Sequence, residues 1–162
     1  MAAMVLSLTG CGKKEQSAKL DPALEKQLGS IQTAEEEGKA FIATQMKADT
    51  ALKQTKSGLV YKIIEPGAGD TFKPTDVVKV AYTGKHVSGE VFDSSQGEAV
   101  DFPLQNVVPG FREMITMMRP GAKAYCILPG SIAYGSQGNQ SIAPNETLVF
   151  EIETKGLAGQ NN

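Results

Sequence analysis

Metal-binding side chains are scarce in this sequence of 162 residues, which has one histidine, two cysteines and no tryptophan. The single histidine, His86, argues against a histidine-based zinc site. Cys11 and Cys126 stand too far apart in the sequence to form a metal-spaced pair. We therefore expect neither a metal ion nor another cofactor.

An excess of charge and a long apolar run are also missing. Sixteen Lys and Arg residues stand against eighteen Asp and Glu residues, and the formal charge of -2 offers no basic footprint for DNA or RNA. No run approaches the roughly 20 apolar residues of a membrane-spanning helix. The sequence therefore predicts no nucleic-acid partner and no helix that crosses a bilayer.

The remaining composition is that of an ordinary folded domain. With 41% hydrophobic and 21% charged residues, the chain has the profile of one soluble globular domain with a modest appendage. A chain of this size buries about two thirds of the surface that its unfolded form exposes. Its core therefore needs neither a disulfide framework nor a structural metal.

The first residues have the layout of a lipoprotein signal. Residues 1–8 are apolar, Leu8-Thr9-Gly10-Cys11 resembles the bacterial lipobox, and a polar stretch follows. We expect residues 1–11 to be a signal-peptide remnant and residues 12–20 a polar linker. Lipid on Cys11 would then anchor the protein in the bacterial envelope, at the outer membrane or the periplasmic face. The alternative is a frayed cytosolic terminus with a chance cysteine, which the lack of a basic stretch before the apolar residues favours.

Residues 21–56 read as a helical arm, because their apolar positions recur at a 3.6-residue period with charged residues between them. Asp21 is the expected N-cap, Pro22 the first helical residue, and Lys56-Ser57-Gly58 the stop. Gly29-Ser30 and Gly38 are points where the arm could divide. Its apolar stripe could pack on the chain's own domain or form a homodimer, and the pattern favours neither. The acidic residues 35–37 indicate a solvated helix face.

After Gly58 the pattern changes to short β-branched and aromatic runs between turn residues. One helix interrupts them, opening at Pro109-Gly110 and ending at Pro120-Gly121. This order predicts an α+β fold, an antiparallel half-barrel sheet wrapped around one short helix. The expected strands are Leu59 to Ile64, Val77 to Thr83, Val91-Phe92, Val100 to Phe102, Ala122 to Leu128 and Thr147 to Gly156.

Five segments of the strand-rich part form an ordered set of motifs. They are Val80-Ala81-Tyr82-Thr83-Gly84, Val91-Phe92-Asp93-Ser94-Ser95, Val107-Val108-Pro109-Gly110-Phe111, Ala133-Tyr134-Gly135 and Pro144-Asn145-Glu146-Thr147-Leu148-Val149-Phe150-Glu151. Their order and spacing resemble one enzyme family, the FKBP-type peptidyl-prolyl cis-trans isomerases. The preceding helix and lipobox are similar to bacterial surface members of the macrophage infectivity potentiator group. The resemblance implies an isomerase domain over residues 57–158 and a flexible tail over residues 159–162.

The resemblance implies an enzyme that rotates X-Pro bonds in proline-containing client polypeptides and assists protein folding in the envelope. Amide resonance opposes this rotation, and an apolar pocket raises the charge-separated planar amide relative to its twisted form. Macrolide inhibitors would enter the same pocket. The alternative function on this scaffold is a chaperone-like or surface partner-binding module with weak or no isomerase activity.

By the same resemblance, Tyr82, Asp93 and Tyr134 are the expected catalytic residues. The backbone N–H of Val108 and the Tyr134 hydroxyl would donate hydrogen bonds to substrate carbonyls. Asp93 would lie close to the rotating carbonyl carbon or accept a hydrogen bond from the Tyr82 hydroxyl. The expected substrate-binding residues are Phe92, Phe102, Val107, Val108, Phe111, Ile142 and Phe150, with Val100 as an alternative to Phe102.

Several of these residues have structural alternatives. Phe150 and Val107 could equally be core residues, and Asp93 could serve only an Asx-turn or a cap. Phe111 stands where most of the family has tryptophan, which implies a deeper pocket and weaker macrolide binding. The loop from Gln96 to Asp101 has no arginine to hold Asp93 as in many relatives.

Two further residues have unremarkable expected roles. We expect His86 to be a solvent-exposed turn residue and not a catalyst or ligand. Cys126, in a predicted strand, is expected to be a structural or partly exposed thiol.

Overall fold

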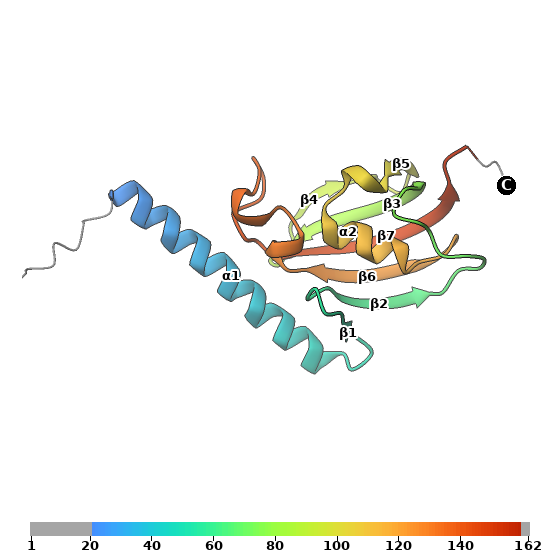
Figure 1. Ribbon diagram of the computed structural model, residues 1–162. Coiled ribbons are helices and arrows are strands. Elements are labelled where there is room, and N and C mark those ends of the chain that lie inside the picture. Colours follow the sequence, from blue (N-terminus) through green and yellow to red (C-terminus); the bar gives the residue numbers. More distant parts are fainter. Residues whose placement is uncertain (1–20, 160–162) are drawn as a thin grey trace, which may run out of the picture.

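The arm predicted at the amino end is a single helix. The computed structural model describes residues 21–159, in which α1 (Pro22–Ala48) runs unbroken through Gly29 and Gly38 (Figure 1). The Asp21 side chain accepts a hydrogen bond from the Ala23 N–H at 3.1 Å, which confirms the predicted N-cap. The predicted signal-peptide remnant, the polar linker, Cys11 and the last three residues of the expected tail lie outside the described residues.

Helix α1 ends earlier than predicted, at Ala48, and the expected stop at Lys56-Ser57-Gly58 is wrong. The reason is the strand β1 (Lys53–Gln54), which pairs with β2 and was missed in the sequence because both of its residues are polar and exposed. Between helix and strand, Leu52 turns inward and is buried.

The main body is an antiparallel sheet of seven strands in the order β1-β2-β6-β7-β3-β4, with β5 also paired to β3. All six predicted strands are present, with ends shifted by at most three residues. The predicted α+β fold is confirmed, and the sheet is open. Its remaining strands are β2 (Val60–Glu65), β3 (Val77–His86), β4 (Val91–Ser94), β5 (Val100–Pro103), β6 (Lys123–Leu128) and β7 (Leu148–Leu157).

The second helix lies across one face of the sheet (Figure 1). This helix, α2 (Pro109–Thr116), begins at the predicted proline and ends one turn before Pro120-Gly121. Its buried residues Phe111, Met114 and Ile115 join the inward side chains of the strands in the main core. Three short helical turns complete the fold, η1 (Leu104–Asn106), η2 (Gly130–Ile132) and η3 (Gly135–Gln137).

The opposite face of the sheet is covered at one end by the second half of α1. Alternation along β7 sends Leu148 and Phe150 into the main core and Val149 to the other side. There Val149 forms a second cluster with Leu52, Val60 and Ile127, against which Phe41, Ile42 and Met46 of α1 pack. The apolar stripe of the arm is therefore used, in this half, to pack on the chain's own domain.

Candidate functional site

An aromatic pocket with a volume of about 200 Å³ opens between α2, the strands β3 to β5 and the segment that follows η2. It contains nine of the ten pocket and catalytic residues expected from the sequence. The lining residues are Tyr82, Phe92, Asp93, Phe102, Asn106, Val107, Val108, Phe111, Tyr134 and Phe150.

The pocket floor is Phe111, which is only 4% exposed. Its ring centroid lies 5.4 Å from that of Phe150, 5.7 Å from that of Phe102 and 6.1 Å from that of Tyr82. All three contacts are edge-on or tilted, which is the arrangement that the aromatic quadrupoles favour. Phe111 of α2 therefore packs against three aromatic rings that belong to strands of the sheet.

A glycine in β3 allows two of these rings to meet. Phe92 and Phe150 contact each other edge to face, with centroids 5.7 Å apart, directly over Gly84. A Cβ at Gly84 would lie 2.6 Å from Phe92 and 2.9 Å from Phe150, which no side chain tolerates. Because residue 84 has no side chain, Phe92 and Phe150 can pack against each other and form a continuous pocket wall.

Asp93 and Tyr82 supply the polar contact at the rim of the pocket. The Tyr82 hydroxyl donates a hydrogen bond to Oδ2 of Asp93 at 2.6 Å, one of the two arrangements expected from the sequence. Asp93 lies within β4, opposite Gly84 of β3. Burial, and then the hydrogen bond to Asp93, raise the pKa of the Tyr82 hydroxyl well above its usual range. Tyr82 therefore remains a neutral donor.

Tyr134 is the exposed aromatic residue of the pocket, 38% accessible at its mouth. Partial burial and the nearby charge of Asp93 raise the pKa of its hydroxyl as well. The pocket thus combines an apolar interior with two protonated hydroxyl groups and one carboxylate at its rim.

One sequence expectation about the lining needs correction. Ile142 does not line this pocket, because its side chain is 3% exposed and belongs to the main core. Phe102 lines the wall as expected, and its alternative Val100 is exposed outside the pocket. Asn106 was missed, since an asparagine at the end of a short helical turn carries no sequence signal of its own.

His86 and Cys126 also have defined places. His86 closes β3, half-buried beside Phe92 and hydrogen-bonded to Glu146, so the expectation of a solvent-exposed turn residue was wrong. Cys126 is fully buried, and burial raises the pKa of its thiol far above the usual range. It is the structural thiol expected from the sequence.

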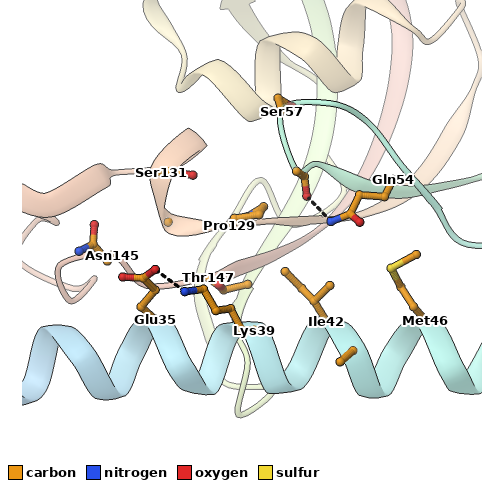
Figure 2. Close-up of a pocket in the computed structure, with 13 residues that line it drawn as sticks. Glu35, Lys39, Ile42, Met46, Gln54, Ser57, Pro129, Ser131, Asn145 and Thr147 are labelled. Carbon is orange, nitrogen blue, oxygen red and sulfur yellow. Dashed lines mark hydrogen bonds and ion pairs between the residues drawn. The ribbon is translucent and has the colours of Figure 1, made fainter.

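A second, larger hollow of about 520 Å³ lies between α1 and the main body (Figure 2). Glu35, Lys39 and Ile42 line it from the helix, and Pro129 and Thr147 from the body. Its lining includes no aromatic side chain, and its lysine is paired with Glu35 at 2.7 Å. This groove, called the arm groove below, is larger than the aromatic pocket and is lined by aliphatic and polar side chains instead of aromatic rings.

Neither a metal site nor a membrane helix is found in the part of the chain that the structure describes. Among residues 21–159, no group of three or more His, Cys, Asp or Glu side chains could hold a metal ion. None of the helices there is both long enough and apolar enough to span a bilayer.

Comparison with known proteins identifies a family over most of the sheet domain. The family model for FKBP-type peptidyl-prolyl cis-trans isomerase matches residues 69–155. A probable FKBP-type peptidyl-prolyl cis-trans isomerase of Haemophilus influenzae is 44% identical over 140 residues, covering 84% of this chain and 58% of that protein. The peptidyl-prolyl cis-trans isomerase Mip of Coxiella burnetii is 39% identical over 120 residues, or 72% of this chain and 52% of the relative. The chain thus spans about half the length of these curated relatives.

Solved structures show the same likeness. The crystal structure of FkpA from Escherichia coli has a TM-score of 0.79 and 34% identity, covering 83% of this chain and 64% of that one. A peptidyl-prolyl cis-trans isomerase from Pseudomonas syringae has a TM-score of 0.72 and 30% identity, covering 78% of this chain and 95% of that one.

Proposed function

Because this chain belongs to the FKBP-type peptidyl-prolyl cis-trans isomerase family, we propose that it accelerates cis–trans rotation of X-Pro bonds in client polypeptides. The observation that carries the proposal is the aromatic pocket, in which buried Phe111 lies beneath the Tyr82–Asp93 hydrogen bond. We assign residues 57–158 to the isomerase domain and residues 21–56 to the arm.

Desolvation is the main source of catalysis in this proposal. Rotation about a prolyl amide has a barrier of about 18–20 kcal/mol, because resonance stabilises the planar form. The planar form is the more charge-separated one, so moving it from water onto the rings of Phe111, Phe102 and Phe150 destabilises it more than the twisted form. No covalent step, acid or base is needed.

The polar groups at the rim orient the substrate. The Tyr134 hydroxyl donates a hydrogen bond to one substrate carbonyl. The backbone N–H of Val108, at the start of α2, donates a hydrogen bond to another substrate carbonyl. Asp93 lies beside the carbonyl carbon of the rotating bond. That carbon becomes more electrophilic when the nitrogen lone pair leaves conjugation, and a fixed carboxylate stabilises it.

The test is isomerisation of a short X-Pro peptide by the full chain, followed by NMR exchange or a coupled protease. We expect acceleration by the wild type and a loss of about tenfold or more in Asp93→Leu, with unchanged melting. Glu151→Gln is the matched control, because Glu151 is an exposed carboxylate on the neighbouring β7 outside the aromatic pocket. A folded wild type without activity would refute the proposal.

The relatives and the first residues of the chain support a proposal for the location of the protein. FkpA-like and Mip-like relatives suggest a bacterial envelope protein. We propose that lipid on Cys11 anchors it at the outer membrane or the periplasmic face. Labelling of cells with a fatty-acid analogue should mark the wild type and not Cys11→Ser, and an unlabelled wild type would contradict the anchor.

We also propose that the first half of α1 forms a homodimer. Among the α1 side chains that the structure describes, Phe41, Ile42 and Met46 of the second half pack on the chain's own domain, whereas Leu24 in the first half is 44% exposed. Light scattering should report a dimer for the wild type and a shift toward monomer in Leu24→Glu. A monomeric wild type at high concentration would refute this assembly.

A second candidate function, capture of unfolded clients as a chaperone-like module, is favoured by the arm groove. Its mixture of apolar and hydrogen-bonding side chains suits an extended peptide (Figure 2). Ala43→Glu puts a charge into the groove, and Ala40→Glu, on an exposed helix position outside it, is the matched control. Only the first should weaken suppression of client aggregation. Equal suppression by both variants would remove this function from the groove.

A further inference from the structure

A largely buried pair of hydrogen-bonded polar side chains lies behind the wall of the aromatic pocket. Nδ1 of His86, the last residue of β3, is hydrogen-bonded to Oε1 of Glu146, which precedes β7. The two side chains are 20% and 15% exposed. A polar pair removed from water to this extent is retained only where its geometry is well satisfied.

The histidine side of this pair touches the pocket wall. The ring centroid of His86 lies 5.2 Å from that of Phe92, with the ring planes inclined at 60°. Phe92 itself lines the pocket and packs on Phe150. Displacement of the imidazole therefore removes the support on the outer side of the Phe92 ring.

The glutamate side holds the segment that carries Tyr134. Oε2 of Glu146 accepts a hydrogen bond from the Ala143 N–H at 2.7 Å. The adjacent Asn145 N–H donates to the carbonyl of Gly135 at 2.8 Å, and Gly135 directly follows Tyr134. The Glu146 carboxylate thus holds the end of the segment that begins with Tyr134 at the pocket mouth.

The pair therefore adds a side-chain link between two parts of the pocket, beside the point where β3 and β7 pair at His86 and Leu148. The Phe92–Asp93 wall belongs to the β3–β4 hairpin, whereas Tyr134 belongs to the irregular segment between β6 and β7. Phe92 of the wall contacts the His86 ring, and His86 is hydrogen-bonded to Glu146. The residue before Glu146, Asn145, is hydrogen-bonded through its backbone to Gly135, next to Tyr134 at the pocket mouth.

We propose that His86 and Glu146 are positioning residues for the isomerase pocket, which together set the position of Tyr134 relative to Phe92 and Asp93. The inference rests on the proposed isomerase function. Neither residue lines the pocket, so their effect on the reaction is transmitted through Phe92 and through the segment before β7.

A double-mutant cycle on the full chain tests the pair with an X-Pro peptide. His86→Phe keeps a ring against Phe92 and removes the hydrogen bond, while Glu146→Ala removes both bonds of the carboxylate. We expect each to lower kcat/KM by about fivefold, mainly through KM, and the double variant to lose no more than the worse single one. Glu146→Gln, which can still accept from Ala143, should recover at least half of the loss.

The matched control is Glu151→Gln, which breaks the exposed Lys85–Glu151 pair beside His86 and should leave kcat and KM unchanged. Wild-type kinetics in folded His86→Phe and Glu146→Ala would overturn the proposal. So would additive losses in the double variant, or a fall in melting temperature with unchanged kcat/KM.

Hydrogen exchange separates failure of this inference from failure of the proposed function. In Glu146→Ala the amides of Ala143 and Asn145 should exchange about tenfold faster than in the wild type, and in Glu151→Gln they should not. Unchanged exchange overturns the link even if the wild type is active. An inactive wild type with the expected exchange refutes the isomerase proposal while leaving the link between Glu146 and the Tyr134 segment intact.

Discussion

Tyr82 and Asp93 are joined by a hydrogen bond of 2.6 Å between neighbouring strands β3 and β4, at the rim of the aromatic pocket. The contact orients the carboxylate that we place beside the rotating bond, although the following loop contains no arginine. A neutral hydroxyl holds the carboxylate without cancelling its charge. The Asp93 carboxyl group is therefore fixed in direction.

Removing this hydroxyl should reduce turnover without harming the fold. In Tyr82→Phe the ring contacts with Phe102 and Phe111 are kept, but Asp93 loses its donor. We expect kcat/KM for a short X-Pro peptide to fall about threefold to tenfold, which corresponds to the loss of one hydrogen bond of ordinary net strength, about 0.5–1.5 kcal/mol. Tyr125→Phe, on β6 outside this pocket, is the control and should behave as the wild type. Equal activity of Tyr82→Phe would show that Asp93 needs no orientation.

A larger aromatic residue at the floor should tighten macrolide binding. Phe111 is buried beneath a pocket of about 200 Å³, and Phe111→Trp extends the floor into it. We expect the Kd of a macrolide inhibitor to fall about fivefold, from roughly 1 kcal/mol of additional apolar contact. Calorimetric titration measures the Kd, and the melting temperature checks that the larger ring is accommodated. A weaker complex of a folded variant would contradict the proposed role of this floor.

A side chain at Gly38 should separate the arm from the body. Gly38 is buried in α1 against Thr147, and a Cβ there would lie 2.7 Å from the Thr147 Cβ and nearer still to its hydroxyl oxygen. We expect Gly38→Val to lower the free energy of unfolding by about 1–3 kcal/mol, measured by urea titration. Gly29→Ala, with nothing within 4 Å, is the control and should stabilise the helix by up to about 1 kcal/mol. A stable Gly38→Val protein would mean that the helix shifts freely on the body.

Alkaline pH should destabilise the protein through its buried thiol. Burial raises the pKa of Cys126 in the folded state, while the unfolded thiol loses its proton above about pH 8.5. The contribution to stability is therefore fully present below that pH and falls as the pH rises, by up to about 1.4 kcal/mol per pH unit. Urea titrations between pH 7 and about 10 should show a shallower decline in Cys126→Ala than in the wild type. Parallel declines would show that the thiol does not titrate on unfolding.

Short-range patterns were sufficient to predict most elements of the fold. The alternation from Leu148 to Glu153 predicted a strand with one buried face, and β7 has it from Phe150 onward, whereas Val149 on the other face is also buried, in the cluster against which α1 packs. Pro109-Gly110 predicted the start of α2, and Asp21 the cap of α1. Each of these signals is contained within a few residues, because capping and strand alternation are local.

Contacts between distant residues were not predictable in this way. The end of α1 at Ala48 is followed by Leu52, which packs in a cluster with residues of β2, β6 and β7, and by β1, which pairs with β2, and neither contact is marked in the local sequence. His86 has the sequence context of a turn, yet it pairs with Glu146, 60 positions later. Ile142 was assigned to the pocket by its place in a motif, and its burial in the core depends on the loop around it.

The sequence by itself determined the class of the fold, the order of its strands and the aromatic and polar residues that line the pocket, because periodicity, turn residues and motif order are properties of the chain. The tertiary structure alone decided the packing of α1 over the outer face of the sheet, the bond between Tyr82 and Asp93, and the His86–Glu146 pair. These depend on register and on close approach between segments far apart in the sequence, where a single residue such as Gly38 or Gly84 determines whether two elements can touch.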